Sequence, residues 1–158
     1  MGIILDKNSL TDVLKDWRSQ NKTIVFTNGC FDILHRGHVE YLNAAKKLGD
    51  ILVLGLNSDE SVKRLKGETR PYVEENDRAF ILSQLISIDA VVIFREDTPK
   101  DLLHLIKPDI LAKGGDYSVD QVVGREIVEA YGGKVVTISL VDGRSTTDLI
   151  GKITTRNK

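Results

Sequence analysis

Apolar and polar positions along this chain follow two repeating patterns, and each pattern predicts a different element. Short continuous apolar runs are typical of strands that are covered on both faces. They occur at residues 23–27, 51–56, 90–94, 109–113 and 134–140. Segments whose apolar residues recur every three or four positions indicate amphipathic helices. These are expected at residues 9–19, 39–48, 60–65, from 76 or 77 onward, 98–107, 121–131 and 145–153.

Capping residues and periodicity refine several of these helices. Ser9 is a suitable N-cap for the first one, and Pro99 stands where the first helical residue of a later one is expected. The helix that opens at residue 76 or 77 is predicted to turn four apolar side chains inward, those of Ala79, Leu82, Leu85 and Ile86. Residues 154–158 are expected to fray.

Strands alternate with helices five times, which predicts an α/β fold with a Rossmann-like, doubly wound, five-stranded parallel sheet. The length of 158 residues fits one domain, with an N-terminal helix in residues 1–20 and a core in residues 22–153. Right-handed crossovers place the carboxyl ends of all the strands on one rim of the sheet.

Composition narrows the classes of partner. The chain has 41% apolar and 28% charged residues and a net charge of −1, so it offers no general attraction for nucleic acid or for an anionic membrane. We expect neither as a partner. A single cysteine, no signal-peptide pattern and no apolar run of membrane-spanning length predict a cytoplasmic location.

Polar clusters follow four of the predicted strands. They lie at residues 28–38, at 57–59 together with the basic segment 63–70, at 113–117 and at 142–147. Any one of them alone is explained as a turn or a helix cap. Four clusters on the rim where such folds bind ligands indicate a binding site.

The first cluster carries the most specific chemistry. His35 and His38 stand three residues apart at the start of a predicted helix, so their rings are expected on one side of it. Gly37 between them allows a ligand to approach the backbone closely. The amino end of a helix after a strand receives phosphate groups. This turn therefore predicts phosphoryl or nucleotidyl transfer.

Two features of these clusters have other interpretations. Cys30, His35 and His38 have the spacing C-x4-H-x2-H, which is compatible with a three-ligand zinc site or a Cys–His nucleophilic pair. Cys30 is otherwise a small packed residue. The basic segment 63–70 is either a solvated helix face or a cationic clamp for a second phosphate-bearing substrate.

The segment Gly29-Cys-Phe-Asp-Ile-Leu-His-Arg-Gly-His38 resembles the G-x-F-D-x-x-H-x-G-H signature of the cytidylyltransferase-like nucleotidyltransferase superfamily. The superfamily's second signature, I-S-T-T, corresponds to Arg144-Ser-Thr-Thr147, where Arg144 departs from the usual small or apolar residue. Segments 64–71, 96–99 and 113–117 are similar to the D-glycero-β-D-manno-heptose 1-phosphate adenylyltransferases of ADP-heptose synthesis. The resemblance extends over residues 22–153.

This resemblance implies an enzyme that transfers AMP from ATP to a heptose 1-phosphate, giving ADP-heptose and pyrophosphate for lipopolysaccharide core synthesis. It implies Mg²⁺ as cofactor. It also implies a stand-alone form of a domain that is elsewhere fused to a sugar kinase, so that a separate heptose kinase and a phosphatase supply the substrate. An exposed apolar helix face is consistent with a homodimer.

The resemblance and the strand-end positions together imply roles for individual residues. The catalytic residues are predicted to be His35, His38 and Lys66. The predicted nucleotide-binding residues are Thr27, Asn28, Gly29, Cys30, Phe31, Gly37, Lys113, Gly114, Asp116, Ser145, Thr146 and Thr147. The predicted sugar-phosphate-binding residues are Asn57, Asp59, Arg64, Arg70 and Arg78. Asp32 is the candidate to orient the metal.

Two other functions stay open. One is a cytidylyltransferase that acts on glycerol 3-phosphate or another polyol phosphate. The segment Leu140-Val-Asp-Gly143 weakens it, since such enzymes carry Arg-Thr-Glu-Gly there. The other is a nucleotide-sensing module without catalysis, against which the set of basic and hydroxyl residues argues. Class I aminoacyl-tRNA synthetases share a similar His-x-Gly-His turn, but the short length and neutral charge exclude them.

Overall fold

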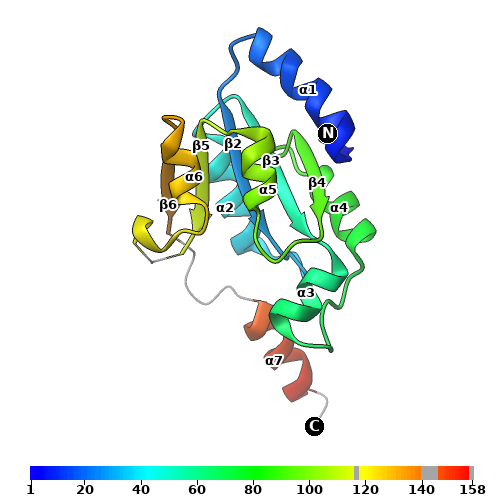
Figure 1. The fold of residues 1–158 in the computed structure, drawn as a ribbon. Coiled ribbons are helices and arrows are strands. Elements are labelled where there is room, and N and C mark those ends of the chain that lie inside the picture. Colours follow the sequence, from blue (N-terminus) through cyan, green and yellow to red (C-terminus); the bar gives the residue numbers. More distant parts are fainter. Residues whose placement is uncertain (116–117, 140–145, 157–158) are drawn as a thin grey trace.

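The computed structural model describes residues 1–115, 118–139 and 146–156. Within these residues the centre of the molecule is a six-stranded sheet in the order β1-β4-β3-β2-β5-β6, and all of its neighbouring strands are parallel. The strands are β1 (Ile3–Leu5), β2 (Ile24–Gly29), β3 (Ile51–Asn57), β4 (Ala90–Phe94), β5 (Ile110–Gly114) and β6 (Lys134–Ile138). Figure 1 shows helices on both faces, with α5 in front of the sheet and α2 behind it.

The predicted doubly wound α/β architecture is confirmed, but the predicted number of five strands is wrong. The additional strand, β1, pairs with β4 at the edge of the sheet, Ile3 opposite Ala90. It is three residues long, and its Ile3 and Ile4 side chains are 43% and 49% exposed. A short, half-exposed edge strand has no continuous buried run, so the apolar pattern did not reveal it.

Seven α-helices are present among the described residues. They are α1 (Lys7–Ser19), α2 (Arg36–Lys46), α3 (Asp59–Lys66), α4 (Glu75–Ser83), α5 (Lys100–Ile106), α6 (Arg125–Ala130) and α7 (Thr146–Arg156). A 3₁₀ turn, η1 (Val119–Gln121), precedes α6. No described helix is long and apolar enough to cross a membrane.

Several predicted helix boundaries were wrong for local reasons. The N-cap of α1 is Asp6, whose carboxylate accepts a hydrogen bond from the Ser9 amide at 2.7 Å, so the helix begins before Ser9. The helix predicted at 121–131 is divided because Gly124 has φ 91°, a left-handed conformation that an α-helix does not contain. Pro99 is the N-cap of α5, not its first residue.

Two further predictions, for α4 and for the carboxyl end of the chain, were partly wrong. In α4, Ala79 and Leu82 are buried as predicted. Ile86 is 93% exposed because the helix ends at Ser83, so the helical periodicity no longer applies to it. At the carboxyl end, α7 continues to Arg156, which contradicts the predicted fraying at residues 154–156.

Two apolar clusters, one on each face of the sheet, explain the continuous apolar runs. Alternate strand residues such as Phe26 and Val53 pack against α1, α5 and α6. Their neighbours Val25 and Leu52 pack against α2 and α4 on the other face. Since side chains alternate between the faces of a strand, burying both faces requires apolar residues at consecutive positions.

The sheet reverses its winding between β2 and β5. From β2 the chain proceeds outward to β3 and β4, and then returns to the other side of β2 for β5 and β6. β2 pairs with β3 at six positions, from Ile24 to Gly29, but with β5 only at Val25 and Phe26. Beyond Phe26 the ladder to β5 stops. Open sheets of this kind bind ligands outside the carboxyl ends of strands at such a point.

Candidate active site

A cleft of about 710 Å³ lies at the carboxyl ends of β2 and β5. Its lining comes from the β2–α2 turn, the end of α3, the loop that follows α3, the end of β5 and the start of α7. The residues that line it are Asn28, Gly29, Cys30, Phe31, Asp32, His38, Leu65, Lys66, Arg70, Lys113, Gly114 and Thr146. Except for Leu65, all of these were predicted as site residues. The substrate roles given to them remain predictions.

Phe31 shapes the β2–α2 turn. It has φ 45°, in the left-handed region that non-glycine residues seldom adopt, and only 8% of it is exposed. Its ring lies against Gly29, where an added Cβ would come within 2.8 Å of a ring carbon. The same ring contacts His38 edge-on, with centroids 5.1 Å apart. A side chain at position 29 would displace Phe31 and, through it, His38.

His35 and His38 lie together at the start of α2, as predicted. Their rings are stacked with centroids 3.8 Å apart and 22° between the planes. His35 is the N-cap residue, and Gly37 is buried in the first turn. Both Nδ1 atoms are buried and have no hydrogen-bond partner among the described residues.

Burial keeps both imidazoles neutral. It lowers the pKa of His35, and it lowers the pKa of His38 to about 4, with a further contribution from the neighbouring His35. A neutral imidazole carries one N–H donor and one acceptor. At neutral pH the pair therefore offers two uncharged donors, and a bound anion would favour their protonation.

Lys113 lies near the end of β5, across the cleft from the histidines of the β2–α2 turn. Its Nζ donates a hydrogen bond to Asn28 Oδ1 at 2.5 Å, which bridges the ends of β2 and β5 by side chains. No carboxylate among the described residues forms an ion pair with it. Burial lowers its pKa to about 8. A buried cation without a counter-charge favours an anionic ligand.

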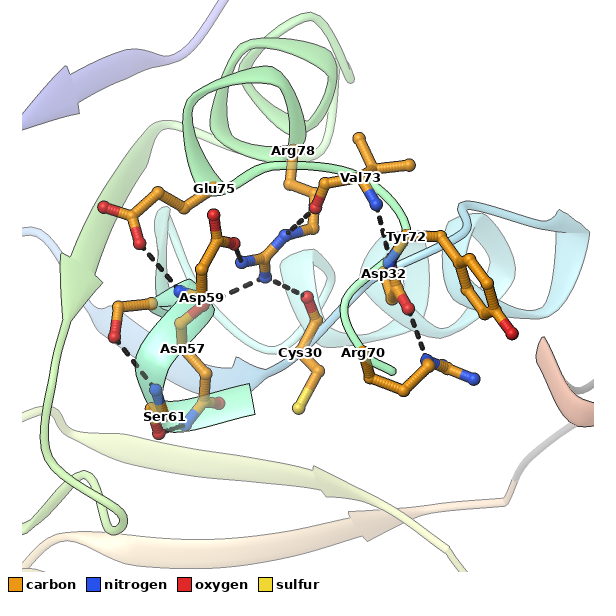
Figure 2. Close-up of polar contacts among 11 residues, drawn as sticks. Cys30, Asp32, Asn57, Asp59, Ser61, Arg70, Tyr72, Val73, Glu75 and Arg78 are labelled. Carbon is orange, nitrogen blue, oxygen red and sulfur yellow. Dashed lines mark hydrogen bonds and ion pairs between the residues drawn. The ribbon is translucent and has the colours of Figure 1, made fainter. Parts of the chain in front are cut away.

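Asp32 anchors the loop between α3 and α4. Its buried carboxylate accepts hydrogen bonds from Arg70 Nε at 2.6 Å and from the amides of Tyr72 and Val73 at 2.7 and 3.0 Å (Figure 2). Both oxygens are thus occupied, which argues against the predicted metal-orienting role.

The described residues contain no group of three His, Cys, Asp or Glu side chains arranged to hold a metal ion. The zinc interpretation of Cys30, His35 and His38 therefore has no support here. Burial raises the pKa of the Cys30 thiol, which also disfavours the Cys–His nucleophilic pair.

Three residues predicted to bind the sugar phosphate lie behind the cleft. Arg78 is 1% exposed and donates hydrogen bonds to neighbouring backbone and to Asp59 Oδ1 at 2.6 Å. Asn57 is buried and donates to Ser61 Oγ at 3.0 Å. None of these lines the cleft. The sequence pattern did not distinguish an arginine buried among carbonyls from one at a surface.

Arg64 points away from the cleft, whereas Lys66 lines it. Arg64 binds the Asp97 carboxylate at 2.7 Å and the Arg95 carbonyl at 2.5 Å. Residues two positions apart on a helix point in nearly opposite directions, so Arg64 and Lys66 cannot serve the same ligand.

Thr27 braces the sheet instead of facing the cleft. It is fully buried, and its hydroxyl lies 2.6 Å from Tyr41 Oη, which donates to the Ala112 carbonyl at 3.1 Å. Sequence reasoning missed Tyr41 because it lies on the apolar face of α2, where an aromatic residue signals only packing.

The predicted residues of the last cluster are only partly described. Thr146 lines the cleft, and its hydroxyl lies 3.5 Å from the Ile33 carbonyl. Thr147 belongs to α7. Asp116, Arg144 and Ser145 lie outside the described residues.

The fold and the cleft define a nucleotide-binding α/β domain, and the comparison with known families specifies it. Residues 26–154 match the cytidylyltransferase-like family. The chain belongs to this family of nucleotidyltransferases, which confirms the resemblance expected from the two signatures.

Curated relatives are similar over nearly the whole chain. The bifunctional protein HldE of Syntrophotalea carbinolica is 59% identical over 150 residues, which cover 95% of this chain and 31% of the relative. The bifunctional protein HldE of Geobacter sulfurreducens is 56% identical over 144 residues, which cover 91% of this chain and 29% of the relative. The chain thus spans about three tenths of the length of these relatives.

Solved structures support the fold. The lipopolysaccharide core biosynthesis protein of Thermoplasma volcanium is 32% identical, with a TM-score of 0.62 over 76% of this chain and 97% of that one. A pantoate-beta-alanine ligase of Francisella tularensis has a TM-score of 0.65 over 100% of this chain and 79% of that one. Its identity of 15% shows a shared fold alone.

Proposed function

We propose that this chain transfers AMP from ATP to D-glycero-β-D-manno-heptose 1-phosphate. An oxygen of the sugar phosphate attacks the α-phosphorus of ATP in line, the bond to the bridging β-phosphate oxygen breaks, and ADP-heptose and pyrophosphate form. The attacking group is already an anion, so the protein needs no nucleophile of its own. Its contribution is positioning and charge stabilisation.

The observation that carries this proposal is the charge balance of the cleft. Lys113 lies on one side without a carboxylate partner among the described residues, and Lys66 and Arg70 lie on the other. The neutral pair of His35 and His38 stands at the β2–α2 turn. Such a set of donors suits a polyanion that bridges both sides, as two phosphate-bearing substrates would.

The individual roles follow from this arrangement. His35 and His38 donate hydrogen bonds to the phosphates as charge develops on the α-phosphoryl group. The amides at the start of α2 and the Thr146 end of α7 receive the remaining phosphate oxygens. Lys66 and Arg70 hold the acceptor phosphate.

The described residues supply no three-ligand metal group, so we propose that Mg²⁺ is held chiefly by phosphate oxygens and water. No step above depends on it. The identity of the sugar is supported by the resemblance of segments 64–71 and 113–117. It is further supported by the HldE relatives and by the lipopolysaccharide core biosynthesis protein.

The test is a matrix of the four nucleoside triphosphates against sugar and polyol phosphates, with pyrophosphate release as the readout. We expect turnover with ATP and the heptose 1-phosphate. Preference for CTP with glycerol 3-phosphate would establish the cytidylyltransferase alternative instead. Binding of ATP without turnover across the panel would establish a nucleotide sensor.

The setting of the reaction is part of the proposal. We propose a homodimer in the cytoplasm, with a kinase and a phosphatase outside residues 1–158 supplying the heptose 1-phosphate. Neither nucleic acid nor a membrane takes part. Sedimentation equilibrium at micromolar concentrations tests the homodimer, since a monomer would be half the expected mass.

A further inference from the structure

The loop at residues 67–74, between α3 and α4, is held at one residue, Val73, from two sides. The Val73 amide donates to Asp32 Oδ1 at 3.0 Å, and the Val73 carbonyl accepts from Arg78 Nε at 2.8 Å (Figure 2). The amide of Tyr72 adds a second bond to Asp32, at 2.7 Å. Surface loops are ordinarily mobile, so two buried ionic side chains bound to one loop residue indicate that its position matters.

Arg78 connects this loop to the ends of two central strands. Its Nη1 donates to the Cys30 carbonyl at 2.5 Å and to the Asn57 carbonyl at 2.9 Å. Its Nη2 donates to Asp59 Oδ1 at 2.6 Å. The side chain is 1% exposed, and each of its three nitrogens has a partner. Four of its five N–H groups are bonded to the protein, and the side chain is almost completely buried, which argues against direct contact with a substrate.

Arg70 belongs to this fixed loop and lines the cleft. Its Nε is bonded to Asp32 at 2.6 Å, and among the described residues no partner engages Nη1 or Nη2, which leaves that end available at the cleft lining. The guanidinium also lies 5.0 Å from the centre of the Tyr72 ring. Arginine loses much rotamer freedom when it grips a ligand, and prior fixation reduces that loss.

We propose that Asp32 and Arg78 are positioning residues that fix the loop at residues 67–74, so that Arg70 presents its Nη atoms to the phosphate of the acceptor substrate. This rests on the proposed function for the identity of the acceptor. It assigns Arg78 a different role from the direct sugar-phosphate contact that its sequence position suggested, and it separates Asp32 from metal binding.

The substitution Asp32→Asn tests the Arg70 link. Asparagine keeps an oxygen for the two loop amides but places an N–H group or a weaker acceptor opposite Arg70 Nε. The KM for the acceptor should rise about tenfold, while the KM for ATP stays within about twofold. In an Arg70→Ala background the same change should add little, because interacting residues are not additive.

Asp109→Asn is the matched control. The Asp109 carboxylate also binds an arginine, Arg18, at 2.8 Å and a backbone amide, that of Ile24, at 2.7 Å, but at the opposite edge of the sheet. It should lower stability without changing either KM, and by less than Asp32→Asn, because the Asp109 side chain is 43% exposed and that of Asp32 only 2%. Arg78→Lys, which keeps the charge but not the set of bonds, should raise the acceptor KM as Asp32→Asn does. Arg78→Met should raise it further.

Hydrogen exchange separates this inference from the proposed function. If the wild-type protein turned over no heptose 1-phosphate, the proposed function would fail, but Asp32→Ala should still accelerate exchange at the Tyr72 and Val73 amides at least about tenfold. Asp109→Ala should not. The inference is overturned if Asp32→Asn and Arg78→Lys lower only the melting temperature. It is also overturned if Asp32→Asn raises the acceptor KM equally without Arg70.

Discussion

The amino and carboxyl ends of the central strands, called here the amino and carboxyl edges, both carry charged groups, but the groups are paired differently. At the amino edge, Asp109 binds Arg18 and a β2 amide, and Asp89 binds Lys46 and a β3 amide. At the carboxyl edge, Lys113 is partly buried beside a neutral asparagine. At the carboxyl ends Arg70 and Arg78 are also paired, with Asp32 and Asp59, so Lys113 is the cation there that has no carboxylate partner among the described residues. We infer that this one unpaired cation, and not the number of charges, marks the side of the sheet that binds an anion.

The largest expected effect comes from the stacked histidines at the carboxyl edge. His38→Ala should lower kcat by about 10²–10³-fold, since it removes a preorganised donor to the developing charge. His35→Ala should act in the same direction. Pyrophosphate release under saturating substrates measures kcat. The control is His104→Ala, an exposed histidine on α5. Near-normal turnover in both His35→Ala and His38→Ala would contradict the proposed mechanism.

Replacing Lys113 should weaken ATP binding without lowering the stability of the free protein. Lys113→Met should weaken ATP binding about 10–100-fold, because a charge-assisted hydrogen bond to phosphate is lost. The same change should leave the free protein equally stable or more stable by about 1 kcal/mol, since a buried charge disappears. Calorimetry gives the affinity and thermal melting the stability. Lys134→Met, at the amino edge of β6, is the matched control and should change neither.

Lys113 also predicts a pH dependence of binding. Its pKa in the free protein is about 8, so ATP affinity should fall as the pH rises from 7 to 9 and the ammonium group loses its proton. Lys113→Met should flatten this fall. An unchanged slope in the variant would assign the pH dependence to another group.

Breaking an ion pair at the amino edge should have the opposite result, a loss of stability with unchanged kinetics. Asp89→Asn removes the charge that Lys46 binds, and should destabilise the fold by about 1–3 kcal/mol. Both KM values and kcat should stay within about twofold of the wild-type values. Denaturant unfolding measures the stability. A loss of turnover in the folded variant would show that the two edges are not separate in function.

A last expected effect, confined to acid solution, is on stability. The pKa of His38 is about 4 in the folded protein and near 6.5 when unfolded, so only the unfolded chain takes up this proton between those values. Proton uptake by His38 therefore stabilises the unfolded chain alone, and the free energy of unfolding decreases as the pH falls from about 6.5 to 4. His38→Asn should reduce the decline in melting temperature over this interval. An equal decline in both proteins would contradict the assignment.

Sequence patterns predicted most of the residues that line the cleft, because these residues directly follow strand ends in short local segments. The β2–α2 turn carries both histidines, and the strand-end position of Lys113 follows from the apolar run before it. The β1 edge strand was missed because three half-exposed residues carry no buried pattern. Arg78 and Thr27 were placed at the ligand because a sequence shows the type of a side chain but not whether neighbouring carbonyls and hydroxyls have already engaged it.

The short ladder between β2 and β5 has a mechanical consequence. Only two residues of β2, Val25 and Phe26, pair with β5, and beyond them the Asn28–Lys113 side-chain bond joins the strands. Among the described strand pairs, this one has the fewest paired residues. A ligand that contacts both strands in the cleft would add bonds where the ladder has none. We therefore expect ligand binding to slow the separation of β2 from β5.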